Sequence, residues 1–370
     1  MKIVVTGGAG YIGSHTCIEL IEAGHTVIIV DNLCNSQEET IERIKQITRK
    51  NITYYLNDVT DESAINTIFS KHRIDAIIHF AGLKAVGESV EKPLEYYYNN
   101  IVSTLVLAKA CQKFGVRKFV FSSSATVYGG NQVPFIESMQ LQPTTNPYGE
   151  TKAVSERILS DIVKANSDWA VAILRYFNPI GAHESGLIGE APNGIPNNLM
   201  PYITQVAKGK LDKLRVFGGD YETVDGTGIR DYIHVCDLAM GHVAALDKLT
   251  RGVHIYNLGT GKGASVLQLV HEFEKVNSIY VPYEIEARRP GDIPECYADA
   301  SKAQRELGWK AKRNLEDMCR DAWRFEQNYS ELVPSRLSLL NGKMANLGWR
   351  ELFDEYNSTA VALYNKTSNS

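Results

Sequence analysis

The chain has 370 residues, of which 22% are charged and 44% hydrophobic, and its formal net charge at pH 7 is −4. This length allows a large core and more than one conventional domain. The small net charge, without a long run of one sign, argues against nucleic acid or an anionic membrane as a partner, and no apolar run is long enough to span a bilayer.

The first predicted unit is a strand at residues 3–6, a glycine turn, a helix at residues 14–23 and a second strand at residues 26–30. Gly7, Gly10 and Gly13 follow the spacing G-x-x-G-x-x-G. Glycines let the backbone turn sharply and approach a pyrophosphate, and a helix N-terminus offers unpaired N–H groups and a positive dipole end. The unit therefore predicts a dinucleotide site, against the alternative of a glycine-rich turn without a ligand.

Asp31 ends the second predicted strand. A carboxylate at this position can accept hydrogen bonds from both ribose hydroxyls of an adenosine, and it repels a 2′-phosphate. The sequence therefore favours NAD over NADP as the cofactor.

Helices and strands alternate as far as residue 178. We predict helices at residues 41–50, 64–71, 94–114 and 148–164, and strands at residues 52–56, 76–80, 118–121 and 171–175. This alternation predicts an α/β fold with a Rossmann-type doubly wound parallel sheet. Ligands of such sheets bind beyond the carboxyl ends of the strands, where Asp58 and residues 81–84 and 122–124 are expected.

Tyr148 and Lys152 lie one turn apart at the start of a predicted helix, which Pro147 can open. An ammonium beside a phenol favours the phenolate and lowers the pKa of the phenol. Tyr148 is therefore a candidate base that works near neutral pH. Many helices carry Tyr and Lys at this spacing by chance, so this interpretation depends on the neighbouring cofactor site.

Beyond residue 178 the chain becomes rich in glycine, proline and asparagine, at residues 178–201 and 218–230. Short strands are predicted at 229–234 and 254–258, and a basic loop at 288–292. We expect a smaller mixed α/β C-terminal domain whose loops carry substrate contacts. Arg230 and Arg289 could clamp a diphosphate, although each could equally be an ordinary surface arginine. A further helix is predicted at residues 351–364.

The six cysteines are scattered, with no Cys-x-x-Cys pair, and the histidines form no ligand-spaced cluster. This pattern argues against a structural metal and is typical of a protein in the reducing cytoplasm. The first residues lead directly into a predicted strand, so we expect no cleaved signal.

Taken together, these motifs resemble the extended short-chain dehydrogenase/reductase superfamily, and within it the UDP-glucose 4-epimerase family (also called UDP-galactose 4-epimerase). The resemblance runs from residue 1 to about residue 327. It rests on residues 6–15, 80–89, 122–129, 146–149, 174–179, 196–202 and 225–235. The stretch from residue 178 to residue 230 is the most specific to the epimerases.

The resemblance implies tightly held NAD, a UDP-hexose substrate and reversible C4 epimerisation of UDP-glucose and UDP-galactose through a 4-keto intermediate, as part of galactose metabolism. It implies that Tyr148 carries the proton and that Lys152 lowers the pKa of Tyr148 and binds the nicotinamide ribose. It also implies that Ser124 hydrogen-bonds the reacting oxygen of the sugar. Around NAD it implies Gly7, Gly10, Tyr11, Ile12, Gly13, Asp31, Asn32, Asn35, Ser36, Asp58, Val59, Phe80, Ala81, Gly82, Lys84, Asn99, Ser122, Tyr148, Lys152 and Phe177. Around the UDP-sugar it implies Lys84, Ser124, Ala125, Thr126, Tyr148, Asn178, Asn198, Leu199, Arg215, Val216, Phe217, Arg230, Tyr232, Arg289, Asp292 and Cys296.

The main alternatives are sister enzymes on the same scaffold and a non-catalytic NAD-binding regulator. Nucleotide-sugar 4,6-dehydratases carry an Asp-Glu pair for elimination where this chain has Ala125 and Thr126, and the decarboxylases keep a Glu in that region. Neither Ala nor Thr can supply the acid for loss of water, which favours plain epimerisation. A regulator that had lost catalysis is disfavoured because Tyr148, Lys152 and Ser124 are all present.

At the position of Cys296 the family has either a bulky Tyr or a smaller residue, which lines the space around the 2-substituent of the sugar. Because Cys is much smaller than Tyr, we expect UDP-GlcNAc and UDP-GalNAc to be interconverted as well. The alternative is that the neighbouring Tyr297 fills the gap.

The resemblance also implies a division of the chain and an assembly. Residues 1–178, with a returning segment near 232–260, would bind NAD, and residues 179–231 and 261–327 would bind the UDP-sugar. Residues 328–370 match nothing in the family, and their role is unknown. The family pairs its two long helices, here 94–114 and 148–164, as a four-helix bundle in a homodimer, although these helices could equally be covered within the monomer.

Overall fold

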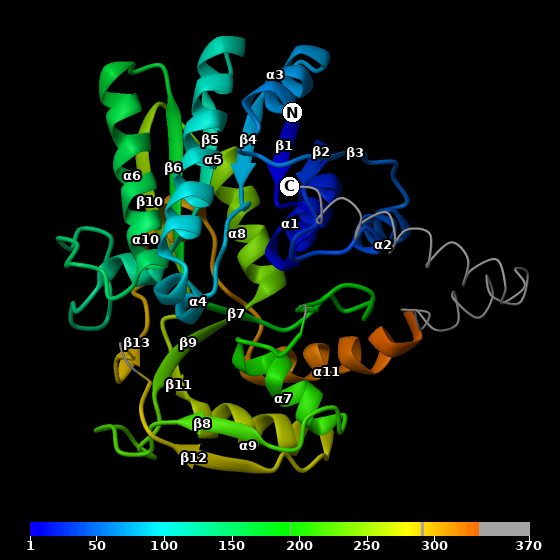
Figure 1. Ribbon diagram of the computed structural model, residues 1–370, viewed down its shortest axis with the longest axis vertical. Coiled ribbons are helices and arrows are strands. Elements are labelled where there is room, and N and C mark those ends of the chain that lie inside the picture. Colours follow the sequence, from blue (N-terminus) through cyan, green and yellow to red (C-terminus); the bar gives the residue numbers. More distant parts are fainter. Residues whose placement is uncertain (193, 290–291, 333–370) are drawn as a thin grey trace, which may run out of the picture. The chain divides into compact units, whose positions relative to one another are not determined.

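The computed structural model describes residues 1–192, 194–289 and 292–332 (Figure 1). The chain divides into two compact units, Met1–Glu326 and Gln327–Ser370. The fold and the candidate site belong to the first unit. The helix predicted at residues 351–364 lies outside the described residues.

Seven parallel strands form the central sheet, in the order β10-β6-β5-β4-β1-β2-β3. The strands are β1 (Lys2–Thr6), β2 (Thr26–Asp31), β3 (Thr53–Leu56), β4 (Ala76–His79), β5 (Lys118–Ser124), β6 (Ala170–Tyr176) and β10 (Gly252–Leu258). The order reverses direction between β1 and β4, which is where doubly wound sheets bind their ligands. The predicted Rossmann-type parallel sheet is therefore confirmed.

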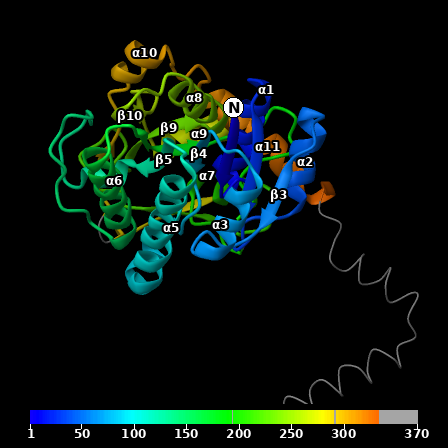
Figure 2. The same cartoon turned by 90° about the horizontal axis from the view of Figure 1, so that it is seen from above.

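Helices cover both faces of this sheet because its strands are apolar on both sides. Ile3 and Val5 point into one core, whereas Val4 points into the other. The first face carries α1 (Tyr11–Glu22), α2 (Glu39–Thr48), α8 (Val235–Asp247) and α10 (Ser301–Leu307). The second carries α3 (Glu62–Lys71), α5 (Pro93–Phe114) and α6 (Pro147–Ala165). Figure 2 shows the two layers from above, with α8 and α10 on one side of the sheet and α5 and α3 on the other.

Helix α6 has clear start signals in the sequence. Pro147 occupies its first turn, where a missing N–H costs little, and the side chain of Asn146 accepts a 2.9 Å hydrogen bond from the backbone N–H of Gly149. The three-residue spacing between Asn146 and Gly149 fixes where α6 begins, and therefore where Tyr148 lies.

The short helix α4 (Val86–Glu91) directly precedes α5 in the chain.

The remaining elements form two small sheets with their own apolar core. The four-stranded sheet contains β7 (Asn178–Ile180), β9 (Ile229–His234), β11 (Gly263–Ser265) and β13 (Glu295–Cys296), and a second sheet pairs β8 (Leu214–Phe217) with β12 (Tyr283–Glu286). Their core is covered by α7 (Leu199–Ala207), α9 (Val266–Asn277) and α11 (Leu315–Leu332). The stretch at 178–201, predicted as irregular, begins with β7 and contains the start of α7.

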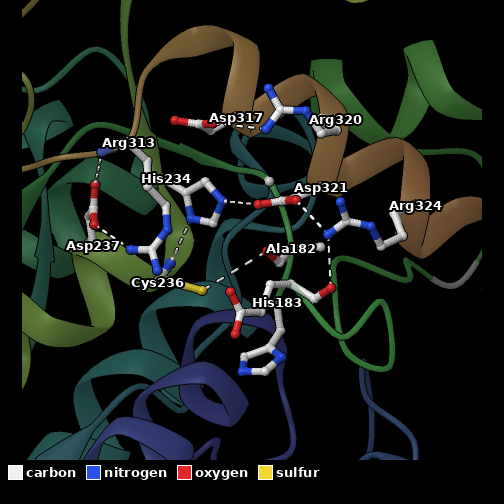
Figure 3. Close-up of polar contacts among 12 residues, drawn as sticks. Ala182, His183, His234, Cys236, Asp237, Arg313, Asp317, Arg320, Asp321 and Arg324 are labelled. Atoms are coloured by element: carbon white, nitrogen blue, oxygen red, sulfur yellow. Dashed lines mark hydrogen bonds and ion pairs between the residues drawn. The ribbon is translucent and has the colours of Figure 1, made fainter. Parts of the chain in front are cut away.

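A buried polar cluster ties α11 to β9 and α8 (Figure 3). The Nε2 of His234 lies 3.2 Å from a carboxylate oxygen of Asp321, while its Nδ1 accepts a hydrogen bond from the backbone N–H of Cys236. Nδ1 therefore carries no proton, and Nε2–H donates to Asp321. Arg324 donates 2.9 Å to the other Asp321 oxygen and 2.8 Å to the carbonyl of Glu184. The cluster anchors the last described helix beside the loop that follows β7.

Candidate active site

A cleft opens at the carboxyl ends of β1, β2, β3, β4 and β5. It is lined by nearly all the residues that the sequence assigned to NAD, from Gly7 to Lys152. Phe177 is not among the lining residues, because it is buried against Ala125, Phe135 and Ala298. The cleft also contains residues that the sequence did not assign to the cofactor, namely Ala9, Ser14, Cys34, Gln37, Thr40, Arg43, Asn57, Ser103, Tyr176, residues 188–192 and Phe325.

The glycine turn between β1 and α1 has no room for side chains. Gly7 has φ +68°, and a Cβ there would lie 2.7 Å from the backbone nitrogen of Ala81. A Cβ on Gly13 would lie 2.1 Å from the carbonyl oxygen of Gly7. The N-cap of α1 is Gly10, whose lack of a side chain leaves the first N–H groups of the helix without a side-chain cap. The glycine turn and the uncapped N-terminus of α1 therefore fit the pyrophosphate of a dinucleotide.

Asp31 is buried at the end of β2 and lies on the same cleft. Its carboxylate accepts hydrogen bonds from the backbone N–H groups of Ala9 (3.0 Å) and Leu33 (2.9 Å) and from the hydroxyl of Ser36 (2.9 Å). These donors fix the carboxylate beside the glycine turn, where an adenosine ribose would follow the pyrophosphate. The residues present therefore fit NAD.

Tyr148 and Lys152 line the cleft, and Ser124 lies beside Tyr148. Lys152 is buried, donates a 2.7 Å hydrogen bond to the carbonyl of Ser122, and holds its ammonium nitrogen 5.9 Å from the centre of the Tyr148 ring. Ser124 ends β5, and its hydroxyl accepts hydrogen bonds from the backbone N–H (3.2 Å) and the hydroxyl (3.0 Å) of Thr126. A proton carrier, a cation and a hydroxyl thus converge at one point.

Burial raises the pKa of the Tyr148 hydroxyl above its usual value, and a hydrogen bond with Ser124 partly opposes this. Burial also lowers the pKa of Lys152 to about 8, while the Glu156 carboxylate acts in the opposite direction. The predicted lowering of the Tyr148 pKa by Lys152 stays a prediction, because burial has the larger effect in the polypeptide alone. The ammonium is directed at the Ser122 carbonyl instead of the phenol oxygen.

Glu190 joins two of the residues expected around the UDP-sugar, Lys84 and Asn198. One of its carboxylate oxygens accepts two hydrogen bonds, one of 2.9 Å from the Lys84 ammonium and one from the side-chain amide of Asn198. The carboxylate is 9% exposed and lies in the wall of the cleft. Glu190 therefore connects the wall of the NAD cleft to the start of α7.

A second group of predicted residues gathers at β9 and β13. Asp292 forms ion pairs with Arg289 (3.0 Å) and Arg230 (3.9 Å), and the Arg289 guanidinium lies 4.8 Å above the Phe217 ring. Cys296 is the register partner of Arg230 between these two strands. The two arginines that could clamp a diphosphate therefore share one carboxylate.

The other residues predicted around the sugar lie in several elements. Ala125 and Thr126 belong to a 3₁₀ helix, η1 (Ala125–Tyr128), Asn178 is exposed in β7, and Leu199 opens α7. Arg215 is exposed beside Glu286, whereas the side chains of Val216 and Tyr232 are buried in the core of the smaller sheets. Any contact of these last two with a ligand would have to come from their backbone.

Comparisons with known proteins agree with this geometry. The family model described as GDP-mannose 4,6 dehydratase matches residues 4–322. A UDP-glucose 4-epimerase from Bacillus subtilis is 58% identical over 331 residues, which are 89% of this chain and 97% of the relative.

Two solved structures are similar in fold as well as in sequence. The UDP-glucose 4-epimerase from Bifidobacterium longum, in complex with NAD⁺ and UDP, has a TM-score of 0.88 and 52% identity, and the match covers 90% of this chain and all of that one. The enzyme from Stenotrophomonas maltophila, with bound NAD and formylated UDP-arabinopyranose, has a TM-score of 0.87 and 50% identity at the same coverage.

Proposed function

The chain belongs to the UDP-glucose 4-epimerase family, and from this premise we propose how its residues interconvert UDP-glucose and UDP-galactose. The enzyme is an isomerase that inverts C4 of a UDP-sugar with NAD as its cofactor. The observation that supports the assignment of roles is that the glycine turn, Asp31, Tyr148 and Lys152 line one cleft, with Ser124 hydrogen-bonded to Tyr148.

Bound NAD supplies a hydride acceptor at C4 and a positively charged ring that favours a nearby phenolate. Tyr148 takes the proton from the 4-hydroxyl and later returns it, so that no net oxidation of the sugar occurs. Ser124 hydrogen-bonds the reacting oxygen and holds it at Tyr148. Lys152, buried between β5 and the cleft, supplies a fixed positive charge that stabilises the phenolate.

The remaining predicted residues hold the UDP end. Arg230 and Arg289 bind the diphosphate, Lys84 and Asn198 contact phosphate oxygens, and Phe217 contacts the base. Because the enzyme holds the substrate by its nucleotide, the hexose is free to rotate between removal of the hydride from C4 and its return. We assign the binding of NAD to residues 1–178 with the returning segment near 232–260, and the binding of the UDP-sugar to residues 179–231 and 261–327.

Dehydration is the second candidate, because the matching family model carries that description. The positions that would supply acid and base for elimination are Ala125, which is buried, and Thr126, whose hydroxyl donates to Ser124. Neither side chain is a carboxylic acid, so loss of water has no proton donor there. Epimerisation is therefore favoured.

Two finer proposals concern the substrate range and the assembly. Cys296 leaves room beside the sugar, so that N-acetylated UDP-hexoses are also substrates.

The enzyme acts as a cytoplasmic homodimer through α5 and α6. This assembly is supported by the exposed apolar side chains of Leu94 and Tyr98 on α5, which are 82% and 66% exposed. None of the described helices is long and apolar enough to cross a membrane.

The proposed function is tested with the purified protein and UDP-galactose, without added cofactor. We expect UDP-glucose to form until the two sugars reach equilibrium, and NAD to be released on denaturation. Formation of a 4-keto-6-deoxy sugar would show dehydration instead, and no conversion with or without added NAD would refute the assignment. Light scattering tests the dimer, which a monomer mass would contradict.

A further inference from the structure

Helix α6 carries a buried charged residue, besides Lys152, that the proposed mechanism does not use. Glu156 lies one turn beyond Lys152 and two turns beyond Tyr148, and it is 4% exposed. Its carboxylate accepts two hydrogen bonds from Arg175, from Nε at 2.9 Å and from Nη2 at 2.6 Å. It also accepts one from the hydroxyl of Ser123. This is a fully buried, bidentate ion pair.

The two partners of Glu156 come from neighbouring strands. Ser123 on β5 and Arg175 on β6 are register partners, so their side chains reach the helix from the same face of the sheet. The Arg175 guanidinium also lies 4.9 Å from the centre of the Tyr128 ring. Glu156 therefore fixes α6 simultaneously to β5 and β6.

Three consecutive residues of β5 thereby bind three residues of α6. The carbonyl of Ser122 accepts from Lys152, the hydroxyl of Ser123 donates to Glu156, and Ser124 hydrogen-bonds Tyr148. A shift of α6 along the sheet would break all three contacts together. The Glu156 contact is the one of the three in which both partners lie outside the proposed reaction centre.

Stability alone is a weak explanation for such a pair. Removing two charges from water is costly, and a buried ion pair is often no more stabilising than apolar residues of the same volume. The position of the carboxylate, next to a buried ammonium on the same helix, offers a functional explanation. In a poorly solvated site a nearby negative charge favours the protonated form of a lysine.

We propose that Glu156, held by Arg175 and Ser123, is a positioning residue for the epimerase reaction: it sets the place of α6 on the sheet and keeps the Lys152 ammonium charged. The proposal rests on the roles given above to Tyr148 and Lys152. Burial lowers the pKa of Lys152 to about 8, and Glu156 is the neighbour that raises it.

Several titratable or charged groups surround Lys152. On its own helix these are Tyr148 and Glu156. His79 on β4 is buried, and its pKa is lowered to about 3, so it stays neutral. On β6 they are Tyr176, whose pKa burial raises, and Arg175. The carboxylate of Glu156 is therefore the negative charge that offsets the cations Lys152 and Arg175.

The test separates charge from packing with two variants. Glu156→Gln keeps the size of the side chain but leaves Arg175 unpaired and buried. The double variant Glu156→Gln with Arg175→Met removes the ion pair as a unit and leaves no buried, unpaired Arg175. In Glu156→Gln we expect Lys152 to lose its proton at lower pH, which moves the alkaline limb of kcat down by about one pH unit. In the double variant we expect a smaller shift in the same direction, because the more distant Arg175 cation is lost as well. KM for UDP-galactose should stay near the wild-type value.

A second readout is independent of turnover. Reductive methylation modifies only the neutral amine, so Lys152 should react faster in both variants at neutral pH, as measured by peptide mass spectrometry. The matched control removes another ion pair, between the buried carboxylate of Asp237 and Arg313 (2.6 Å), by Asp237→Asn with Arg313→Met. This control should lower thermal stability without moving the pH profile.

A double variant that folds and keeps the wild-type alkaline limb and Lys152 reactivity would overturn the proposal, because the pair would then be structural only. A wild-type enzyme that does not interconvert the UDP-sugars would instead refute the proposed function. If Glu156→Gln fails to fold, the double variant still decides between the two explanations.

Discussion

The ammonium nitrogen of Lys152 lies 5.9 Å from the centre of the Tyr148 ring and donates its hydrogen bond to the Ser122 carbonyl instead of the phenol. Tyr148 and Lys152 therefore act as a pair through the field of the cation and not through a direct bond. The phenol oxygen stays free to exchange a proton with substrate, assisted by the hydrogen bond to Ser124.

Tyr148→Phe removes the proton carrier and leaves the shape of the cleft. We expect turnover of UDP-galactose to fall about 10²- to 10⁴-fold, because general acid–base catalysis contributes an effect of this size. The NAD content after gel filtration should stay near one per chain. Tyr280→Phe, at a residue that is 76% exposed, is the control and should keep full activity. Near-normal turnover of Tyr148→Phe would contradict the assignment.

Lys152→Met removes the buried cation. Because the phenolate then loses its positive neighbour, we expect the acidic limb of the pH–rate profile to move upward and the affinity for NAD to fall. The control is Lys164→Met on the same helix, an exposed lysine paired with Asp161 at 2.8 Å. An unchanged pH profile for Lys152→Met would mean that another group tunes Tyr148.

Gly13→Ala places a Cβ 2.1 Å from the Gly7 carbonyl, so the turn must open. We expect a folded protein that has lost most of its bound NAD, as measured by absorbance after denaturation, and that regains little activity when NAD is added. Gly87→Ala is the matched control, because a Cβ at this helical glycine meets nothing within 4 Å. Full retention of NAD in Gly13→Ala would show that the cofactor does not use this turn.

The sequence was sufficient for those parts of the site in which chemistry follows local spacing. The glycines at 7, 10 and 13, Asp31 and the Tyr148–Lys152 spacing predicted a cleft that the structure does contain. These residues lie in a strand–turn–helix unit or within one helical turn, where local rules determine the geometry.

Contacts between distant segments could not be predicted in this way. Glu190 binds Lys84, which lies 106 positions away in the sequence. Glu156 binds residues of two neighbouring strands, Ser123 of β5 and Arg175 of β6. The direction of the Lys152 ammonium depends on the Ser122 carbonyl, which only the packing of α6 on β5 brings into reach. The burial that raises the pKa of Tyr148 also depends on this packing, and local spacing does not predict it.

Cys296→Tyr tests the substrate range. The small thiol side chain is partly buried opposite Arg230 on the neighbouring strand, and Tyr would extend into the space assigned to the 2-substituent. We expect the wild type to convert both UDP-galactose and UDP-GalNAc, and the variant to lose conversion of UDP-GalNAc by at least about tenfold while keeping that of UDP-galactose. Absence of wild-type turnover with UDP-GalNAc would remove the proposal.

Three buried histidines should make the fold sensitive to acid. Burial lowers the pKa of His15 and His79 to about 3 and that of His242 to about 4. In the unfolded chain a histidine binds a proton below about pH 6.5, whereas these three stay neutral in the fold. Their contribution to the free energy of unfolding is therefore complete above pH 6.5. It is lost as the pH falls, by up to about 1.4 kcal/mol per histidine per pH unit.

His242→Leu isolates one of these contributions. Its ring packs between Phe80 and Tyr176, at centroid distances of 4.8 and 5.6 Å. We expect urea unfolding between pH 6.5 and pH 4 to show a shallower dependence of the free energy of unfolding on pH, by about one proton per molecule. His271→Gln, at an exposed histidine of α9, should leave this dependence unchanged. Equal slopes for His242→Leu and the wild type would mean that His242 takes up its proton without unfolding.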